Sequence, residues 1–277
     1  AVISGNNEIE SNYESCEDQQ LRRMYYSVFE DMIPKLIDKL CPYISYIPSS
    51  PTTCGHFIDP QNENYGDCHY WGVWWADSNF ETYTHKIPRF ASEYGFQGAM
   101  NPETAEKYCS HPYTKDNEDF AIHQKHPRGF ELIDNRIKEW FGDYKDDDQY
   151  ILYSQLTQQE ALKIAVEAHR QHKPYCMGSL FWQFDVPCPC MAWGCIEAKG
   201  EPKPAYYTGR KVFQPVIFAI DKTCPDSIKI YACSDLATDT VLTFKLKIQN
   251  QNDAINYLHI SEKKPLKAQQ TTLLTSI

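Results

Sequence analysis

Short apolar runs alternate with longer segments of mixed polarity along the first 215 residues of the chain. Five of these runs are rich in β-branched and aromatic residues and have the length of strands. Strands that alternate with helices usually build a parallel sheet, so the pattern predicts an α/β architecture. The predicted strands are residues 1–4, 43–48, 69–74, 89–92 and 177–183.

Two of the intervening segments, residues 24–40 and 156–170, have the periodicity of helices, because apolar residues recur there every three or four positions. Both are therefore predicted to be amphipathic helices. Their apolar positions are Val28, Met32, Leu36 and Leu40 in the first segment and Leu162, Ala165 and Ala168 in the second.

The pattern changes after Pro215, where every second residue becomes apolar in residues 227–232 and 240–248. This alternation predicts antiparallel strands of a β-sandwich. Residues 216–277 are fewer than the roughly 100 that a complete immunoglobulin-like sandwich uses. We therefore expect two units, residues 1–215 and the start of a sandwich at 216–277.

The charge of the chain argues against two classes of partner. Its net charge is −10 and it has no run rich in lysine and arginine, so neither a nucleic acid nor a membrane surface is expected as a partner. The longest apolar stretches, such as residues 216–220, are too short to span a bilayer. Aromatic residues make up 14% of the chain, a surplus that slightly favours a carbohydrate ligand.

Eleven cysteines are spread along the whole chain, which does not suggest the dense disulfide framework of a small secreted domain. Most are expected to be buried free thiols. Cys188, Cys190 and Cys195 form the tightest cluster, but they lack the paired spacing and the fourth ligand of a structural zinc site. No metal and no cofactor are expected.

Polar or aromatic residues follow each predicted strand of the first unit, and two of them are the carboxylates Glu8 and Glu93. In a (β/α)₈ barrel, the carboxyl ends of the strands form the active-site face. Glycoside hydrolysis with retention needs two carboxyl groups about 5–5.5 Å apart, which two such glutamates could supply. A carboxylate after a strand can equally be a helix cap or a surface charge.

Two motifs favour catalysis. Residues 4–10, Ser-Gly-Asn-Asn-Glu-Ile-Glu, and residues 89–97, Arg-Phe-Ala-Ser-Glu-Tyr-Gly-Phe-Gln, resemble the acid/base and nucleophile motifs of β-mannosidases in glycoside hydrolase family 2. The resemblance covers residues 1–250 in order. Further similar segments are residues 46–51, 69–74, 176–183, 203–207 and 212–216.

The resemblance implies a retaining, exo-acting β-mannosidase that removes terminal β-mannose from an oligosaccharide, in the lysosome or outside the cell. Glu8 would be the general acid/base and Glu93 the nucleophile, so their environments should push the two pKa values apart. Neither role needs a metal or a cofactor. The implied sugar-binding residues are Asn7, at the 2-hydroxyl, Trp182, at the floor of the subsite, and Trp71, Trp75 and Tyr94.

The resemblance also implies a partial TIM (β/α)₈ barrel, strands 4–8, followed by a truncated β-sandwich. Five strands cannot close such a barrel, so the missing N-terminal half of the same enzyme is a possible partner. The chain departs from the family at Ile3, Val186 and Cys188, and at Trp75, where the family has Tyr or His near the nucleophile. Another family 2 exo-β-glycosidase (galactosidase, glucuronidase or glucosaminidase) or a non-catalytic carbohydrate-binding remnant is the alternative.

Overall fold

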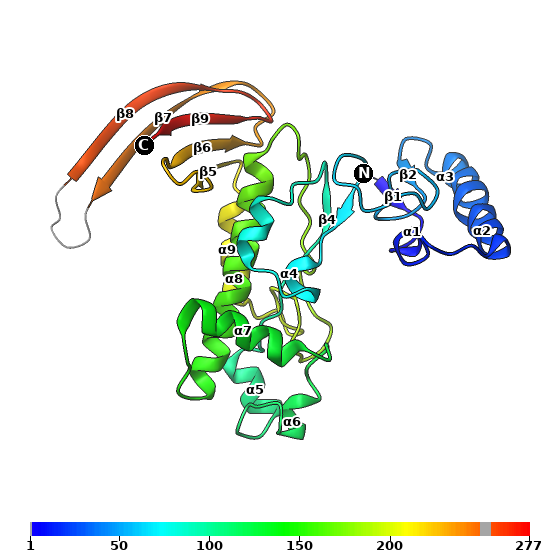
Figure 1. The fold of residues 1–277 in the computed structure, drawn as a ribbon, viewed down its shortest axis with the longest axis horizontal. Helices are drawn as coiled ribbons and strands as arrows, with labels where there is room; N and C mark the ends of the chain where they lie inside the picture. Colours follow the sequence, from blue (N-terminus) through cyan, green and yellow to red (C-terminus); the bar gives the residue numbers. More distant parts are fainter. Residues whose placement is uncertain (1, 250–255) are drawn as a thin grey trace.

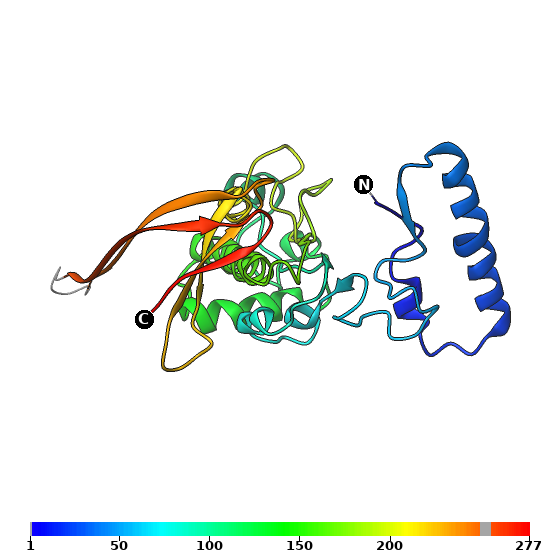
Figure 2. The ribbon, with the colours of Figure 1, turned by 90° about the horizontal axis from the view of Figure 1, so that it is seen from above.

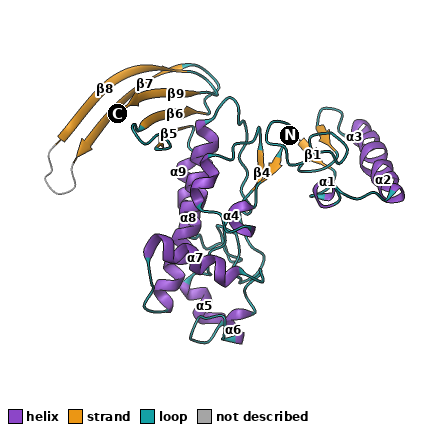
Figure 3. Cartoon of the chain, in the orientation of Figure 1, coloured by secondary structure: helices purple, strands orange, loops and turns teal. Residues whose placement is uncertain are grey.

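The computed structural model describes residues 2–249 and 256–277, without side chains for 248–259, and combines helices with short parallel and longer antiparallel strands (Figures 1 and 3). No helix among the described residues is long and apolar enough to cross a membrane. The helices are α1 (Ile9–Asn12), α2 (Gln19–Tyr25), the π-helix η1 (Tyr26–Met32), α3 (Ile33–Leu40), α4 (Gly72–Trp75), the 3₁₀-helix η2 (Phe80–Thr84), α5 (Pro102–Tyr108), α6 (Glu118–Ala121), α7 (Gly129–Phe141), α8 (Asp147–Gln171) and α9 (Pro204–Val212).

Four short strands form two parallel pairs in the first part of the chain. Strand β1 (Val2–Ser4) pairs with β2 (Ser45–Ile47), and β3 (Cys68–His69) pairs with β4 (Ala91–Glu93). Strands were predicted at residues 1–4, 43–48 and 89–92, and the structure forms a shorter strand in each place. Residue 1 of the first prediction lies outside the described residues.

The prediction of a strand at residues 69–74 is wrong beyond His69. Residues 72–75 form helix α4 instead, and the backbone N–H of Trp75 donates to Trp71 O at 2.7 Å. A short apolar run fits a buried helix as well as a strand, and here the helical turn buries Trp74 completely, against Phe96 and Trp193.

The predicted strand at residues 177–183 lies beside β4 in parallel but is not a regular strand. Ser179 forms an isolated bridge with Ala91. Backbone N–H groups of Met177 and Leu180 donate to Arg89 O and Ala91 O, whereas Trp182 N–H reaches Tyr94 O beyond the end of β4. The ladder is therefore interrupted where β4 ends.

The predicted helix at residues 24–40 is confirmed as part of one helical run formed by α2, η1 and α3. The run begins after Asp18, whose carboxylate accepts hydrogen bonds from two backbone N–H groups and so caps the helix. Its apolar positions lie on the surface, since Met32, Leu36 and Leu40 are 57%, 53% and 64% exposed. No described residue covers this apolar face.

The main core surrounds α8, which packs against η2, α7 and α9. The helix predicted at residues 156–170 lies inside α8, and its apolar positions Leu162, Ala165 and Ala168 are buried as expected. All eleven cysteines are free, but only five are buried, so the prediction that most of them are buried is wrong. Helices η2, α7, α8 and α9 therefore share one hydrophobic core.

From Val216 onward the described chain is antiparallel. Strands β5 (Val216–Asp221), β6 (Lys229–Ser234) and β9 (Thr271–Ser276) form one sheet, and β7 (Thr240–Gln249) pairs with β8 (Asn256–Leu266). The two sheets pack against each other through a small hydrophobic cluster, formed by Ala232, Phe244, Leu266 and Leu274. Figure 2 shows this β-rich part at one end of the molecule and the α2–α3 run at the other.

His169 is buried on α8, where its Nδ1 atom lies 2.9 Å from the hydroxyl of Ser179. Burial lowers the pKa of His169 from 6.5 to about 3, and the neighbouring His172 contributes to this shift. The unfolded chain therefore binds a proton near pH 6.5, whereas the folded chain stays unprotonated until about pH 3. Folding stability is lost as the pH falls through this window.

We expect the urea midpoint of unfolding to fall between pH 7 and pH 5, and to fall less in a His169→Gln variant, which has no group to protonate at this position. His85→Gln is the control because His85 is exposed. The same pH dependence in the parent chain and the His169→Gln variant would contradict this account.

Candidate active site

The two predicted carboxylates lie at the carboxyl ends of the two strand pairs. Glu93 is the last residue of β4, and Glu8 follows β1 after a short turn. The turn is held next to the end of β2, because Glu8 N donates to Ser50 O at 2.8 Å and Ser50 N donates to Asn6 O at 3.0 Å. Glu8 itself has a left-handed backbone (φ 61°) and starts α1.

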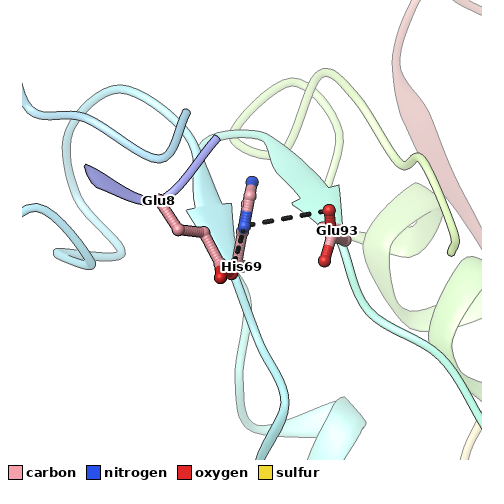
Figure 4. Close-up of side chains that lie close together, drawn as sticks. All are labelled: Glu8, His69 and Glu93. Carbon is pink, nitrogen blue, oxygen red and sulfur yellow. Dashed lines mark hydrogen bonds and ion pairs between the residues drawn. The ribbon is translucent and has the colours of Figure 1, made fainter. Parts of the chain in front are cut away.

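A buried histidine, His69, connects the two carboxylates (Figure 4). It is the last residue of β3, and the β3–β4 register pairs it with Glu93. Its Nδ1 atom lies 2.8 Å from Glu8 Oε1 and 3.9 Å from Glu93 Oε2. One ligand atom from each of the three side chains lies within 4.8 Å of the other two, so the structure brings Glu8 and Glu93 together.

The carboxylate of Glu93 is mostly enclosed and has one hydrogen-bond donor from an indole. Trp71 Nε1 donates to Glu93 Oε1 at 3.0 Å. Burial raises the pKa of Glu93, and the negative charge of Glu8 adds to this rise, while His69 and the Trp71 N–H lower it. Trp71 and His69 are therefore the groups that favour the ionised form of Glu93.

A second layer of hydrogen bonds fixes the ring of His69. Its Nε2 atom lies 3.0 Å from Ser50 Oγ, which lies 2.5 Å from Asp67 Oδ2. Asp67 also accepts from Ser92 Oγ at 2.6 Å and from Thr52 N at 2.9 Å. Glu8 is thus the first of a row of polar side chains that ends at a buried aspartate.

Of the other predicted site residues, only Trp71 forms a side-chain hydrogen bond with either carboxylate. Asn7 is exposed, and its backbone forms a bridge with Ser50. Trp182 is 44% exposed and lies in the segment beside β4. These two side chains lie on the surface near the strand ends, without a hydrogen bond to Glu8 or Glu93.

The structure places Trp75 and Tyr94 elsewhere. Trp75 was expected near Glu93, but Trp71 has that place, and the Trp75 ring packs on His126 with centroids 4.2 Å apart. Tyr94 is buried in the core, and its hydroxyl is bonded to Ser179 at 2.7 Å. Neither side chain forms a hydrogen bond with Glu8 or Glu93.

Sequence reasoning did not assign His69, Ser50 or Asp67 to the site. One signal was available, because Asp67 and His69 are two residues apart and side chains with this spacing point to the same face of a strand. The partners of these two residues follow strands β1 and β2, about 20 to 60 positions away along the chain. The contact with Glu8 could not be derived from local spacing.

Glu8, His69 and Glu93 each offer an atom of a kind that can bind a zinc ion. Glu8 and His69, however, are already at hydrogen-bond distance, so an ion would have to displace the proton between them. The arrangement is a hydrogen-bonded cluster in which the Glu8 carboxylate lies at hydrogen-bond distance from an imidazole and the Glu93 carboxylate accepts from an indole.

The chain is similar to several known proteins, although no family model matches it. It is 23% identical to the β-mannosidase B of Aspergillus flavus over 248 residues, and 25% identical to that of Aspergillus niger over 238. The goat (Capra hircus) β-mannosidase is 26% identical over 229 residues. The crystal structure of a β-D-mannosidase from Dictyoglomus thermophilum matches the whole chain, with a TM-score of 0.86 and 25% identity. The chain resembles the β-mannosidases of glycoside hydrolase family 2.

The β-mannosidase likeness covers most of this chain but a minor part of each relative. The aligned segments span 83%, 79% and 76% of the chain, and 29%, 28% and 26% of the Aspergillus flavus, Aspergillus niger and goat proteins. The chain matches 34% of the Dictyoglomus thermophilum structure. An exo-chitosanase from Amycolatopsis orientalis shares the fold, with a TM-score of 0.64 at 14% identity.

Trp71→Phe removes the N–H that Glu93 accepts, so the pKa of Glu93 should rise further and its ionised form should become scarcer at a given pH. A carbon-13 NMR titration of the glutamate carboxyl groups measures this. Trp75→Phe is the matched control, because Trp75 packs on His126. An unchanged titration of Glu93 in Trp71→Phe would contradict the role of this hydrogen bond.

Proposed function

We propose that Glu8 and Glu93 are the acid/base and the nucleophile of a retaining glycoside hydrolase that releases terminal β-mannose. The observation that carries this proposal is the short distance between the two carboxylates, because one oxygen of Glu8 and one oxygen of Glu93 lie within 4.8 Å of each other. Retaining enzymes hold their carboxyl groups about 5–5.5 Å apart, whereas inverting enzymes keep them about 6.5–9.5 Å apart to admit a water molecule.

In the proposed first step, a carboxylate oxygen of Glu93 attacks the anomeric carbon and Glu8 donates its proton to the leaving glycosidic oxygen. The bond from the anomeric carbon to that oxygen breaks with its electron pair on the oxygen. In the second step, Glu8 takes a proton from water, and the oxygen of this water displaces Glu93 from the sugar. The Trp71 N–H orients the attacking carboxylate throughout.

The proposed substrate class follows from the names of the relatives, since the fungal, mammalian and bacterial proteins described above are β-mannosidases. Asn7, Trp71 and Trp182 are the proposed sugar contacts, because Trp71 touches Glu93 and the other two are exposed near the strand ends. Trp75 and Tyr94 have other contacts and are not included. Neither a nucleic acid nor a membrane is proposed as a partner.

In an active form of the protein, Glu93→Gln should abolish cleavage of aryl β-mannosides, because the nucleophile is lost. Glu8→Ala should retain activity on substrates with good leaving groups, which need no acid, and azide should accelerate it. Aryl β-galactosides, β-glucuronides and β-glucosaminides are the comparison substrates. Equal losses in both variants, with no rescue, would exclude these roles.

We further propose that residues 1–215 are strands 4–8 of a (β/α)₈ barrel, and that residues 216–277 begin an immunoglobulin-like sandwich. The two parallel pairs, the parallel segment beside β4 and the antiparallel strands after Val216 support this division. The missing N-terminal half of the same enzyme is the proposed partner. It would cover the exposed apolar face of the α2–α3 run.

The 277-residue chain alone is expected to be inactive or very weakly active on an aryl β-mannoside. Catalysis needs both carboxylates and the sugar held to within about 0.5 Å, which a half-built barrel does not ensure. Addition of an N-terminal half should raise activity and suppress self-association, measured by turnover and light scattering. Full activity of a monomeric chain by itself would contradict this prediction.

A further inference from the structure

The hydrogen-bond chain that starts at Glu8 needs more protons than its groups ordinarily carry. It has three contacts: Glu8 Oε1 to His69 Nδ1, His69 Nε2 to Ser50 Oγ, and Ser50 Oγ to Asp67 Oδ2. Each contact needs one proton between its two heavy atoms. A neutral imidazole supplies one and a serine hydroxyl supplies one. With both carboxyl groups ionised, one proton is missing.

The position of the additional proton follows from the neighbours at the two ends. At one end, Asp67 accepts hydrogen bonds from Ser50, Ser92 and Thr52, so donors already occupy its oxygens. At the other end, His69 is the only hydrogen-bond partner of the Glu8 side chain among the described residues, and this side chain is 27% exposed. The additional proton is therefore best placed at Glu8 and His69.

With the proton at that end, the direction of every hydrogen bond is fixed. Ser50 donates its hydroxyl proton to Asp67, so its oxygen must accept from His69. The proton of the neutral imidazole then lies on Nε2, and the lone pair on Nδ1 faces Glu8. A serine–aspartate pair of this kind selects one tautomer of a histidine, as the carboxylate does in a catalytic triad.

We propose that Asp67 and Ser50 hold the His69 proton on Nε2, so that the contact between His69 Nδ1 and Glu8 carries an additional proton. In the reaction, which rests on the proposed function, Glu8 gives this proton to the leaving oxygen. Two acceptors, the Glu8 oxygen and Nδ1, then face each other at 2.8 Å. Their repulsion favours proton uptake from water in the second step. His69, Ser50 and Asp67 are positioning residues.

Asp67→Asn tests the inference because the two side chains have the same shape. The amide that this substitution introduces can donate to Ser50, which then donates to His69 Nε2 and moves the imidazole proton to Nδ1. Nitrogen-15 NMR of the histidine-labelled chain should show a protonated Nε2 for His69, and a protonated Nδ1 in Asp67→Asn. His69→Gln assigns the signal. The buried His169 reports whether the fold is intact, and Asp239→Asn, at a surface ion pair, is the control.

A His69 proton on Nδ1 alone in the unmodified chain would overturn the proposal, and so would an unchanged tautomer in Asp67→Asn. Ser50→Ala is the second variant, and it should remove the preference for Nε2. These measurements need no enzymatic activity, so they decide the proposal even if the chain does not cleave mannosides.

In an active form of the protein, the Asp67→Asn substitution should lower the turnover of substrates with poor leaving groups by about 10²–10⁴-fold. The variant should keep its turnover on aryl mannosides with good leaving groups, which need no acid. A merely structural role of Asp67 would reduce both activities alike, and that result would also overturn the proposal. If the unmodified chain, completed by its N-terminal half, cleaves no mannoside, the proposed function alone is refuted.

Discussion

A row of partly buried side-chain hydrogen bonds connects two strand pairs that share no regular ladder among the described residues. Glu8 and Ser50 follow strands β1 and β2, whereas Asp67 and His69 lie at β3. The imidazole is only 2% exposed, and a buried polar group is costly unless it is hydrogen-bonded. The hydrogen bonds of His69 with Glu8 and Ser50 therefore connect the two strand pairs and also fix the orientation of the imidazole ring. This histidine is one of the contacts that set the distance between the two glutamates, since its Nδ1 atom lies 2.8 Å from Glu8 and 3.9 Å from Glu93.

Much of the fold followed from the sequence, because the spacing of apolar residues indicates which side chains are buried. The alternating apolar pattern after Pro215 predicted β6 and β7, and the spacing of Leu162, Ala165 and Ala168 predicted the buried face of α8. The motif at residues 89–97 placed Glu93 at the end of a strand. What local patterns could not provide was the pairing of distant segments, so the contact between His69 and Glu8 was missed.

The helix at residues 72–75 accounts for the position of Trp75. Had the predicted strand at residues 69–74 continued through Trp75, then His69, Trp71 and Trp75 would share one face, because side chains two positions apart point to the same face of a strand. The chain turns into a helix at Gly72, and a helical turn sends Trp75 to His126 while Trp71 stays at Glu93. One change of backbone conformation thus determines which indole reaches the carboxylate.

The apolar face of the α2–α3 run is exposed, so covering it would add to the stability of the fold. Burying a side chain such as Met32, Leu36 or Leu40 contributes about 1.5–3 kcal/mol when the burial is complete. Any segment that covers this face binds only the folded helix and therefore stabilises it by mass action. The melting temperature of the chain is then not a fixed constant but a function of the concentration of the segment that covers this face.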